Sequence, residues 1–276
     1  LVVGTIIASM QAGAVSYLYY ADRVYQLPLG LIGIAFGIVL LPDLSRKLRA
    51  GEDAAARDSL NRGLELAMLL TLPATAALIV IPWEIIVVLF ERGAFAAEAS
   101  EATAAALMAF ATGLPAFVLV KIFQPAFYAR EDTVTPLKTA VVSVVANIVL
   151  SLALFFPLRH VGIALATSIA AWLHIALLGG LLHKRGFLEI DARCRRRLPR
   201  IVLASAVMGA AVWLAARPLA SWFEAGVLVK VSALAILVGG GIAVFALAAV
   251  LTGAADAREI KAQLTPRRGG RMAPDA

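Results

Sequence analysis

The sequence predicts an all-α polytopic membrane protein with about eight transmembrane helices. Of its 276 residues, 61% are hydrophobic and only 16% are charged, and the mean hydropathy is +0.88. A soluble domain is closer to half apolar and a quarter charged, so this excess of apolar residues cannot be buried in one core. The apolar residues also occur in blocks of about 20, the helix length that spans the hydrocarbon of a bilayer.

Polar, proline or glycine residues separate the predicted spans. The chain starts with LVVGTIIASM, without Met and already inside an apolar stretch. We therefore expect the first span to be the truncated end of a helix, and the chain to be the C-terminal part of a longer protein. This stretch has neither a charged n-region nor a small-residue cleavage site, so we do not expect it to be a signal peptide. In chain order, the predicted spans cover 1–12, 17–41, 64–89, 104–128, 137–157, 162–182, 199–216 and 227–251.

Lysine and arginine are distributed unevenly between alternate connections. Nineteen of the 25 lie in 44–63, 129–138, 183–200 and the segment after 252, whereas four lie in 90–103, 157–161 and 216–230. Because cytoplasmic loops carry an excess of positive charge, the first group and the C-terminus are predicted to be cytoplasmic. The alternation through all eight spans supports their number. The net charge of +7 then reflects orientation and attraction to anionic lipid headgroups.

Several function classes are disfavoured by composition. Cys194 is the only cysteine, which excludes an internal disulfide and any cysteine-based metal site, and the three histidines show no metal-ligand spacing. The basic run RCRRRLPR around Cys194 is short and directly precedes a span, which argues against nucleic-acid binding. No nucleophile–base pair, metal cluster or paired carboxylates lie at membrane depth, so we do not expect an enzyme.

The span over 17–41 carries a polar stripe on one helical face. Its members recur at intervals of three, four or seven residues, and the glycines among them allow close helix approach. Pro28 removes a backbone hydrogen bond and should bend this helix just after Arg23. The stripe comprises Ser16, Arg23, Gln26, Gly30, Gly33 and Gly37.

Two interpretations of Arg23 are open. It could be an interfacial arginine that extends toward the headgroups and pairs with Asp22. However, adjacent residues point about 100° apart on a helix, which is poor geometry for mutual pairing. An ionisable residue on a polar face inside the membrane indicates a substrate site, and a guanidinium suits bidentate contact with phosphate. We favour the substrate site for Arg23.

Two further groups of polar residues lie within spans. Lys121 begins a stripe with Gln124 and Tyr128, and both extension to the cytoplasmic surface and a role in a cavity are open. Ser143, Asn147 and Ser151 are spaced four residues apart, and Thr167, Ser168 and His174 lie in the next span. Such residues usually join transmembrane helices, and the alternative is a site for a coupling ion.

Three segments together resemble a known family. They are SYLYYADRVYQLPLGLIGIAFGIVLLPDLSR, LFERGAF and KIFQPAFYAREDTVTP, in which Pro136 is predicted at the first position of a helix. These segments resemble the MurJ/MviN family of lipid II flippases in the MOP exporter superfamily, and the similarity runs in order from about residue 1 to 250. The resemblance implies the second six-helix lobe (1–190), two extra C-terminal helices (191–252) and a cytoplasmic basic tail (253–276) of a fourteen-helix transporter.

The resemblance also implies a function and its residues. The family moves lipid II, the undecaprenyl-pyrophosphate-linked disaccharide-pentapeptide, from the cytoplasmic to the outer leaflet of the bacterial inner membrane by alternating access through a cationic cavity. The family's helix-eight arginine corresponds to Arg23, preceded by Asp22, and a functionally sensitive serine corresponds to Ser16. Gln26 occupies a position that is often acidic in relatives, so no carboxylate role is carried over. With Lys121, these are the predicted substrate-binding residues.

A coupling site is implied less completely. Some members bind sodium through two Asp residues, an Asn and a Thr. Asn147 and Thr167 fit the Asn and the Thr, but Gly4 and Ser151 stand where the two Asp residues are expected. Without a carboxylate the site would bind a cation weakly, so sodium, a proton or the membrane potential remain alternative driving forces. Predicted partners are lipid II, membrane lipids, and cell-wall synthesis and division proteins. The alternative functions are export of another polyprenyl-linked saccharide and a non-transporting membrane scaffold.

Overall fold

Every regular element is helical in the computed structural model, which describes residues 2–93 and 95–254. The predicted tail therefore lies outside the described residues from 255 onward. The helices are α1 (Val2–Ala8), α2 (Ala14–Arg49), α3 (Asp53–Val80), α4 (Pro82–Phe90), α5 (Ala97–Ala111), α6 (Leu114–Tyr128), α7 (Val134–Lys184), α8 (Ala192–Ala216), the 3₁₀ helix η1 (Ala220–Glu224) and α9 (Val227–Leu251).

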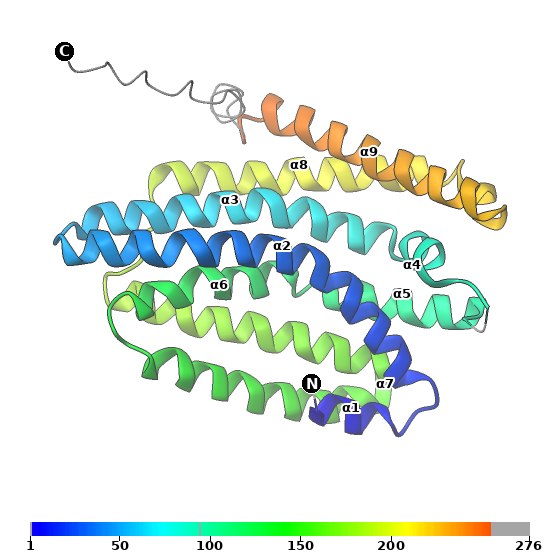
Figure 1. Cartoon of the computed structure of the whole chain (residues 1–276), viewed down its shortest axis with the longest axis horizontal. Coiled ribbons are helices and arrows are strands. Elements are labelled where there is room, and N and C mark those ends of the chain that lie inside the picture. The colour runs from blue at the N-terminus through cyan, green and yellow to red at the C-terminus, as the bar shows by residue number, and fades with distance from the viewer. Residues whose placement is uncertain (1, 94, 255–276) are drawn as a thin grey trace, which may run out of the picture.

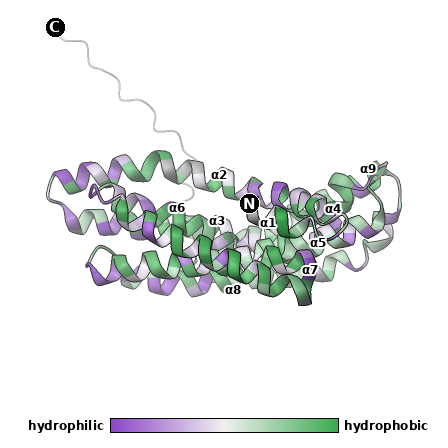
Figure 2. Ribbon diagram, turned by 90° about the horizontal axis from the view of Figure 1, so that it is seen from below, coloured by the Kyte–Doolittle hydropathy of each residue, from purple (hydrophilic) through white to green (hydrophobic). Residues whose placement is uncertain are grey.

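The connections gather at two opposite ends of the bundle (Figure 1). Those after α2, α6 and α7 lie at one end, toward which α9 also runs, whereas those after α1, α4 and α8 lie at the other end. The first group belongs to the segments with most of the lysine and arginine, and we call this side the basic end. Figure 2 shows hydrophilic residues at both ends and hydrophobic residues along the middle. The path of the chain thus matches the alternation of charge.

α7 is a helical hairpin and not one straight helix. Its backbone leaves helical geometry at Arg159 (φ 53°, ψ −137°), after which the chain runs back along the first arm. The hydroxyl of Ser143 donates to the carbonyl of Ala170 across the arms at 2.8 Å. The turn is tight, because a Cβ on Gly162 would lie 2.2 Å from the carbonyl oxygen of Leu154. The two arms correspond to the spans predicted over 137–157 and 162–182.

Six helical segments are long and apolar enough to cross a membrane: α2, α3, Ala97–Tyr128, α7, α8 and α9. Because α7 contributes two arms, these segments account for seven of the eight predicted spans. The span predicted over 64–89 is divided between α3 and α4, where Pro82 begins a new helix. Likewise, 104–128 is divided between α5 and α6. The seven-residue α1 lies where the truncated first span was predicted.

α2 is longer than predicted. The hydropathy pattern predicted that this span ends at residue 41, before Pro42 and Asp43, but the helix continues to Arg49. Its polar end stays helical because Asp43 accepts hydrogen bonds from Lys47 (2.8 Å) and from Ser59 of α3 (2.6 Å). Figure 1 shows that α2 is bent, as expected for a helix that contains prolines.

The core lies where α2, α3, α5, α6 and α7 meet. α6 is central, and its Leu114, Ile122 and Phe127 are fully buried. The first arm of α7 instead exposes many aliphatic side chains, such as Val145 and Val149, as expected for a surface that faces lipid.

The C-terminal helices α8 and α9 pack on each other and along α3 (Figure 1). Gly209 of α8 faces α3, since a Cβ there would be in van der Waals contact with Val80 (3.5 Å) and Ala76 (3.6 Å). At the end opposite the basic end, Lys230 of α9 forms a 3.1 Å ion pair with Glu91, which follows α4. The two C-terminal helices are therefore attached to the rest of the bundle along their length.

Candidate functional site

Arg23 is exposed on α2. Its guanidinium carbon lies 4.9 Å from the ring centroid of Tyr19, one turn earlier. Among residues 2–93 and 95–254, no carboxylate forms a salt bridge with Arg23. A Cβ on Gly30, two turns further along, would meet no atom within 4 Å. This face of α2 is therefore open and carries an arginine whose charge no salt bridge neutralises.

Asp22 is hydrogen-bonded to Gln26 and forms no salt bridge with Arg23 among the described residues. The side-chain amide of Gln26 donates a short hydrogen bond to the carboxylate of Asp22, and both side chains are half-buried. Residues four apart are neighbours on a helix, so the sequence could have revealed this contact. Gln26 is consequently turned toward Asp22, although the helical spacing had grouped it with Arg23.

Lys121 of α6 is exposed beside the glycine stripe of α2. A Cβ on Gly33 would lie 3.6 Å from Cγ of Lys121, so the lysine stem lies over this glycine. Gly33 is ten residues after Arg23, which is about 15 Å along a helix. Lys121 and Arg23 thus lie near the same side of α2 but are too far apart to hold one phosphate group together.

Ser16 lies at the wall of a cavity of about 610 Å³ at the end of the bundle opposite the basic end. The cavity is formed by the start of α2, the end of α4, the connection after it and the start of α5, and we call it the aromatic pocket. Its walls include Tyr17, Tyr20, Phe90 and Phe95. Sequence analysis proposed Ser16 and missed these rings, because aromatic residues in apolar helices are usually core.

The residues proposed for a coupling ion lie on the α7 hairpin. Asn147 Nδ2 donates to Thr167 Oγ1 across the arms at 3.1 Å, and Thr167 Oγ1 donates to the carbonyl of Ile163 at 2.9 Å. The hydroxyl of Ser151 is buried without a hydrogen-bond partner. Gly4 of α1 lies against Ile163, because a Cβ on this glycine would be 3.4 Å from the isoleucine side chain. Asn147 and Thr167 therefore join the two arms in this structure.

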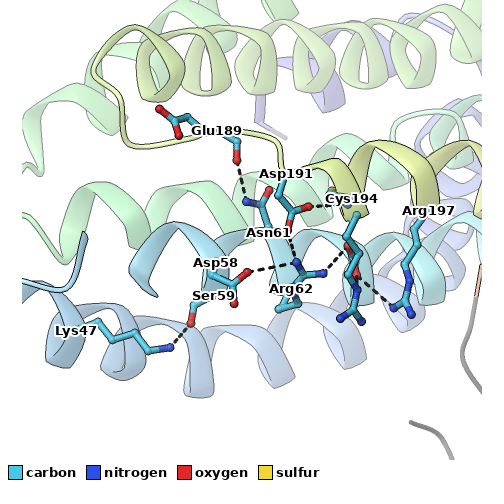
Figure 3. Close-up of polar contacts among 11 residues, drawn as sticks. Lys47, Asp58, Ser59, Asn61, Arg62, Glu189, Asp191, Cys194 and Arg197 are labelled. Atoms are coloured by element: carbon cyan, nitrogen blue, oxygen red, sulfur yellow. Dashed lines mark hydrogen bonds and ion pairs between the residues drawn. The ribbon is translucent and has the colours of Figure 1, made fainter. Parts of the chain in front are cut away.

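An ionic network that sequence analysis missed joins Arg62 of α3 to Asp191 before α8 (Figure 3). The central residue of this network is Glu65 of α3. Its side chain, only 5% exposed, accepts from Arg62 (2.7 Å) on α3, and Arg193 and Arg197 of α8 each approach it at 3.4 Å. Arg62 also bonds Asp191, the residue that caps α8. Glu65 falls inside a predicted span, so the criterion applied to Arg23 could have identified it. The network connects α8 to α3.

Three side chains in this network, Glu65, Asp191 and Cys194, have atoms of the kind that bind metal ions, and these atoms lie within 4.8 Å of one another. The argument from a lone cysteine did not anticipate this arrangement. However, Arg62 bonds both carboxylates, and the backbone N–H of Cys194 donates to Asp191 at 2.6 Å. A metal ion would have to displace the guanidinium group, so the geometry fits ion pairing.

A model of the family "Lipid II flippase MurJ" matches residues 1–234 of the chain. The chain belongs to the MurJ family. MurJ proteins are multi-pass membrane transporters and not enzymes. The family assignment confirms the resemblance inferred from the three sequence segments.

Two MurJ relatives and one solved MurJ structure give the extent of the similarity. The "Probable lipid II flippase MurJ" of Rhizobium tropici is 42% identical over 270 residues, which are 97% of this chain and 51% of the relative. That of Rhizobium meliloti (strain 1021) is 48% identical over 215 residues, 78% of this chain and 40% of the relative. A structure of lipid II flippase MurJ in an inward closed conformation is 25% identical, with a TM-score of 0.75, over 94% of this chain and 50% of that one. The chain spans about half the length of these MurJ proteins.

The segment AREDTVTP, part of the resemblance to MurJ, stabilises a connection at the basic end. Asp132 accepts the backbone N–H of Thr135 (2.9 Å), the Thr135 hydroxyl (2.6 Å) and Arg185 Nη1 (2.6 Å). It thereby holds the start of α7 beside its end. Pro136 is the third residue of α7, and not the first as predicted; a proline is tolerated there because the first-turn N–H groups have no partner within the helix.

We expect Asp132→Asn to lower the melting temperature of the protein at neutral pH. Hydrogen bonds from Thr135 and Arg185 hold the pKa of the Asp132 carboxyl well below its usual range. A carboxyl whose pKa is lowered by folding stabilises the folded protein fully at pH values above the pKa of the unfolded state, about 3.9. As the pH falls below that value, this stabilisation is progressively lost. The melting-temperature difference between wild type and Asp132→Asn should therefore narrow below about pH 4. A difference that is constant from pH 7 to pH 3 would refute the ionic role.

Proposed function

We propose that this chain forms the C-terminal half of a transporter that flips lipid II from the cytoplasmic to the periplasmic leaflet for cell-wall synthesis. Membership of the MurJ family supports this function. The observation that carries it is the exposed Arg23, an arginine without a salt bridge in the described ranges, in a helix long and apolar enough to cross a membrane. Such a charge is costly in hydrocarbon and is retained where it meets a ligand of opposite charge. The pyrophosphate of lipid II is such a ligand.

The proposed mechanism is alternating access. A polar headgroup cannot cross about 30 Å of hydrocarbon unaided, so a hydrophilic cavity between two lobes must shield it while the polyprenyl tail stays in lipid. Residues 1–190 would form one lobe, and the other would come from the part of the relatives that this chain does not match. Rocking of the lobes would expose Arg23 to each side in turn. Asp22, Gln26 and Ser16 would complete the contact with the headgroup, and Lys121 would contribute positive charge.

The proposed location is the bacterial inner membrane, with the basic end in the cytoplasm. The uneven distribution of lysine and arginine supports this orientation. The two C-terminal helices (191–252) would then flank the lobe, and the tail after residue 253 would be cytoplasmic. In this orientation the aromatic pocket opens on the periplasmic side. Cell-wall synthesis and division proteins would be partners of the complete protein.

Lipid II flipping by the complete protein in reconstituted vesicles tests the function, and we expect the rate to be unchanged when sodium is removed. Residues 134–184 and α1 contain no Asp or Glu, so Asn147, Thr167 and Ser151 offer only neutral oxygens. Binding a bare cation with such a set is weak, because hard cations are usually held by carboxylates. The control is replacement of sodium by potassium at constant ionic strength. Loss of flipping without sodium would show that this neutral set does bind a coupling ion.

A further inference from the structure

The aromatic pocket has the chemistry of a saccharide site. Three rings from different elements form one wall: Tyr20 of α2 lies 4.8 Å from Phe90 of α4 and 5.1 Å from Phe95, and the two phenylalanines are 6.1 Å apart, centroid to centroid. All three side chains are only partly buried. The apolar C–H face of a pyranose stacks on such rings, which offer a large rigid surface.

The same pocket has polar groups suited to sugar hydroxyls. Arg92 lies on its wall, and one of its guanidinium N–H groups donates to the carbonyl of Leu89, which orients the side chain. In the part of the chain that the structure describes, no carboxylate forms a salt bridge with Arg92. The hydroxyl of Ser16 is exposed on the opposite element, α2. An apolar wall with a few polar groups that fix orientation is the usual composition of a small-molecule site.

The aromatic pocket and Arg23 lie on the same face of α2. Ser16, Tyr20 and Arg23 are separated by four and three residues, so all three lie on one face of the helix. Ser16 and Arg23 are two turns apart, about 10 Å. A ligand whose phosphate contacts Arg23 would therefore extend its next groups along this face into the aromatic pocket. In a lipid-linked saccharide, the groups next to the pyrophosphate are sugars.

We propose that the aromatic pocket binds the saccharide of the lipid-linked headgroup while Arg23 contacts the pyrophosphate. This inference rests on the proposed function. Tyr20, Phe90 and Phe95 stack on the sugar rings, and Arg92 and Ser16 donate hydrogen bonds to their oxygens. In the proposed orientation the pocket holds the headgroup at the periplasmic side, at the end of its path.

The test compares two ligands on the complete protein in nanodiscs: radiolabelled lipid II and undecaprenyl pyrophosphate, which lacks the saccharide. The pocket variants are Phe95→Leu, which keeps apolar volume but removes the ring, and Arg92→Gln. Matched controls are Phe156→Leu, a residue on the exposed side of α7, and Arg217→Gln, an exposed arginine at the same end. We expect each pocket variant to raise the dissociation constant for lipid II by about three- to tenfold, with no change for undecaprenyl pyrophosphate or in the controls.

The outcomes separate the two proposals. Unchanged lipid II affinity in both pocket variants would overturn the saccharide site and leave the flippase function standing. An equal loss for both ligands would also overturn it, because the pocket would then act on the pyrophosphate or on folding. A third ligand tests the function itself: undecaprenyl phosphate, which lacks both the saccharide and the second phosphate. If the wild-type protein binds lipid II no better than undecaprenyl phosphate, the proposed function fails.

Discussion

Arg23→Ala in the complete protein should abolish lipid II flipping while the protein still inserts into the membrane. The side chain is exposed and lies over the ring of Tyr19, which is also exposed, so its removal leaves no cavity in the core. The transporter would lose a bidentate contact with the pyrophosphate. Hydrogen bonds to charged groups contribute about 1.5–3 kcal/mol each, so the loss of two corresponds to at least about a hundredfold loss in flipping rate. Complementation of a flippase-depleted strain and flipping in vesicles both measure this effect.

Two variants sharpen the interpretation of Arg23. Arg23→Lys should restore only part of the activity, because an ammonium lacks the planar fork of a guanidinium. Arg217→Ala is the matched control, since Arg217 is also exposed and stacks on an aromatic ring, with its guanidinium carbon 3.6 Å from the centroid of Trp213. Normal growth of a strain that carries Arg23→Ala would exclude Arg23 as the phosphate contact.

The largest effect on stability is expected for Glu65→Ala. Glu65 is buried and contacts three guanidinium groups, from Arg62, Arg193 and Arg197. Removing one partner of a buried ion pair typically destabilises a protein by about 3–5 kcal/mol. We expect a loss of this size in the free energy of unfolding of the detergent-solubilised protein, measured by denaturant titration.

Asp58→Ala is the control for Glu65. Asp58 bonds the same Arg62 at 3.3 Å from the same helix, but its side chain is 65% exposed. Exposed ion pairs contribute about 0–1 kcal/mol, so this variant should be near wild type. Equal destabilisation by Asp58→Ala and Glu65→Ala would mean that the burial of Glu65 does not increase the contribution of its ion pairs to the free energy of unfolding. Glu65→Gln should fall between the two, because it keeps one acceptor oxygen.

Hydropathy and charge were sufficient to predict an all-helical membrane protein and the order of its apolar helices, since both follow directly from the cost of polar groups in a bilayer. They could not predict where a span would break. The interruptions before Pro82 and around Gly113 depend on how α4 and α6 pack on their neighbours. Nor could they predict that the polar end of α2 remains helical, because a hydrogen bond from Ser59 of the next helix stabilises it.

The candidate site was predictable only in its local part. Helical spacing brought Ser16 and Arg23 onto one face, but it did not reveal that Gln26 turns toward Asp22. Contacts between segments that are far apart in the chain could not be predicted from the sequence. Phe90 and Phe95 meet Tyr20 only because the connection after α4 returns to the start of α2. A single sequence contains no signal for such a tertiary contact.

The attachment of the C-terminal helices has a consequence for the motion of the transporter. Glu65 connects α8 to α3 at the basic end, and the ion pair between Glu91 and Lys230 connects α9 at the other end. Because α8 and α9 also pack on each other, the pair is held to the bundle at both ends. α8 and α9 would therefore travel with α3 as one rigid body, and a spin label on the outer side of α9 would serve as a reporter of how far the whole half rotates.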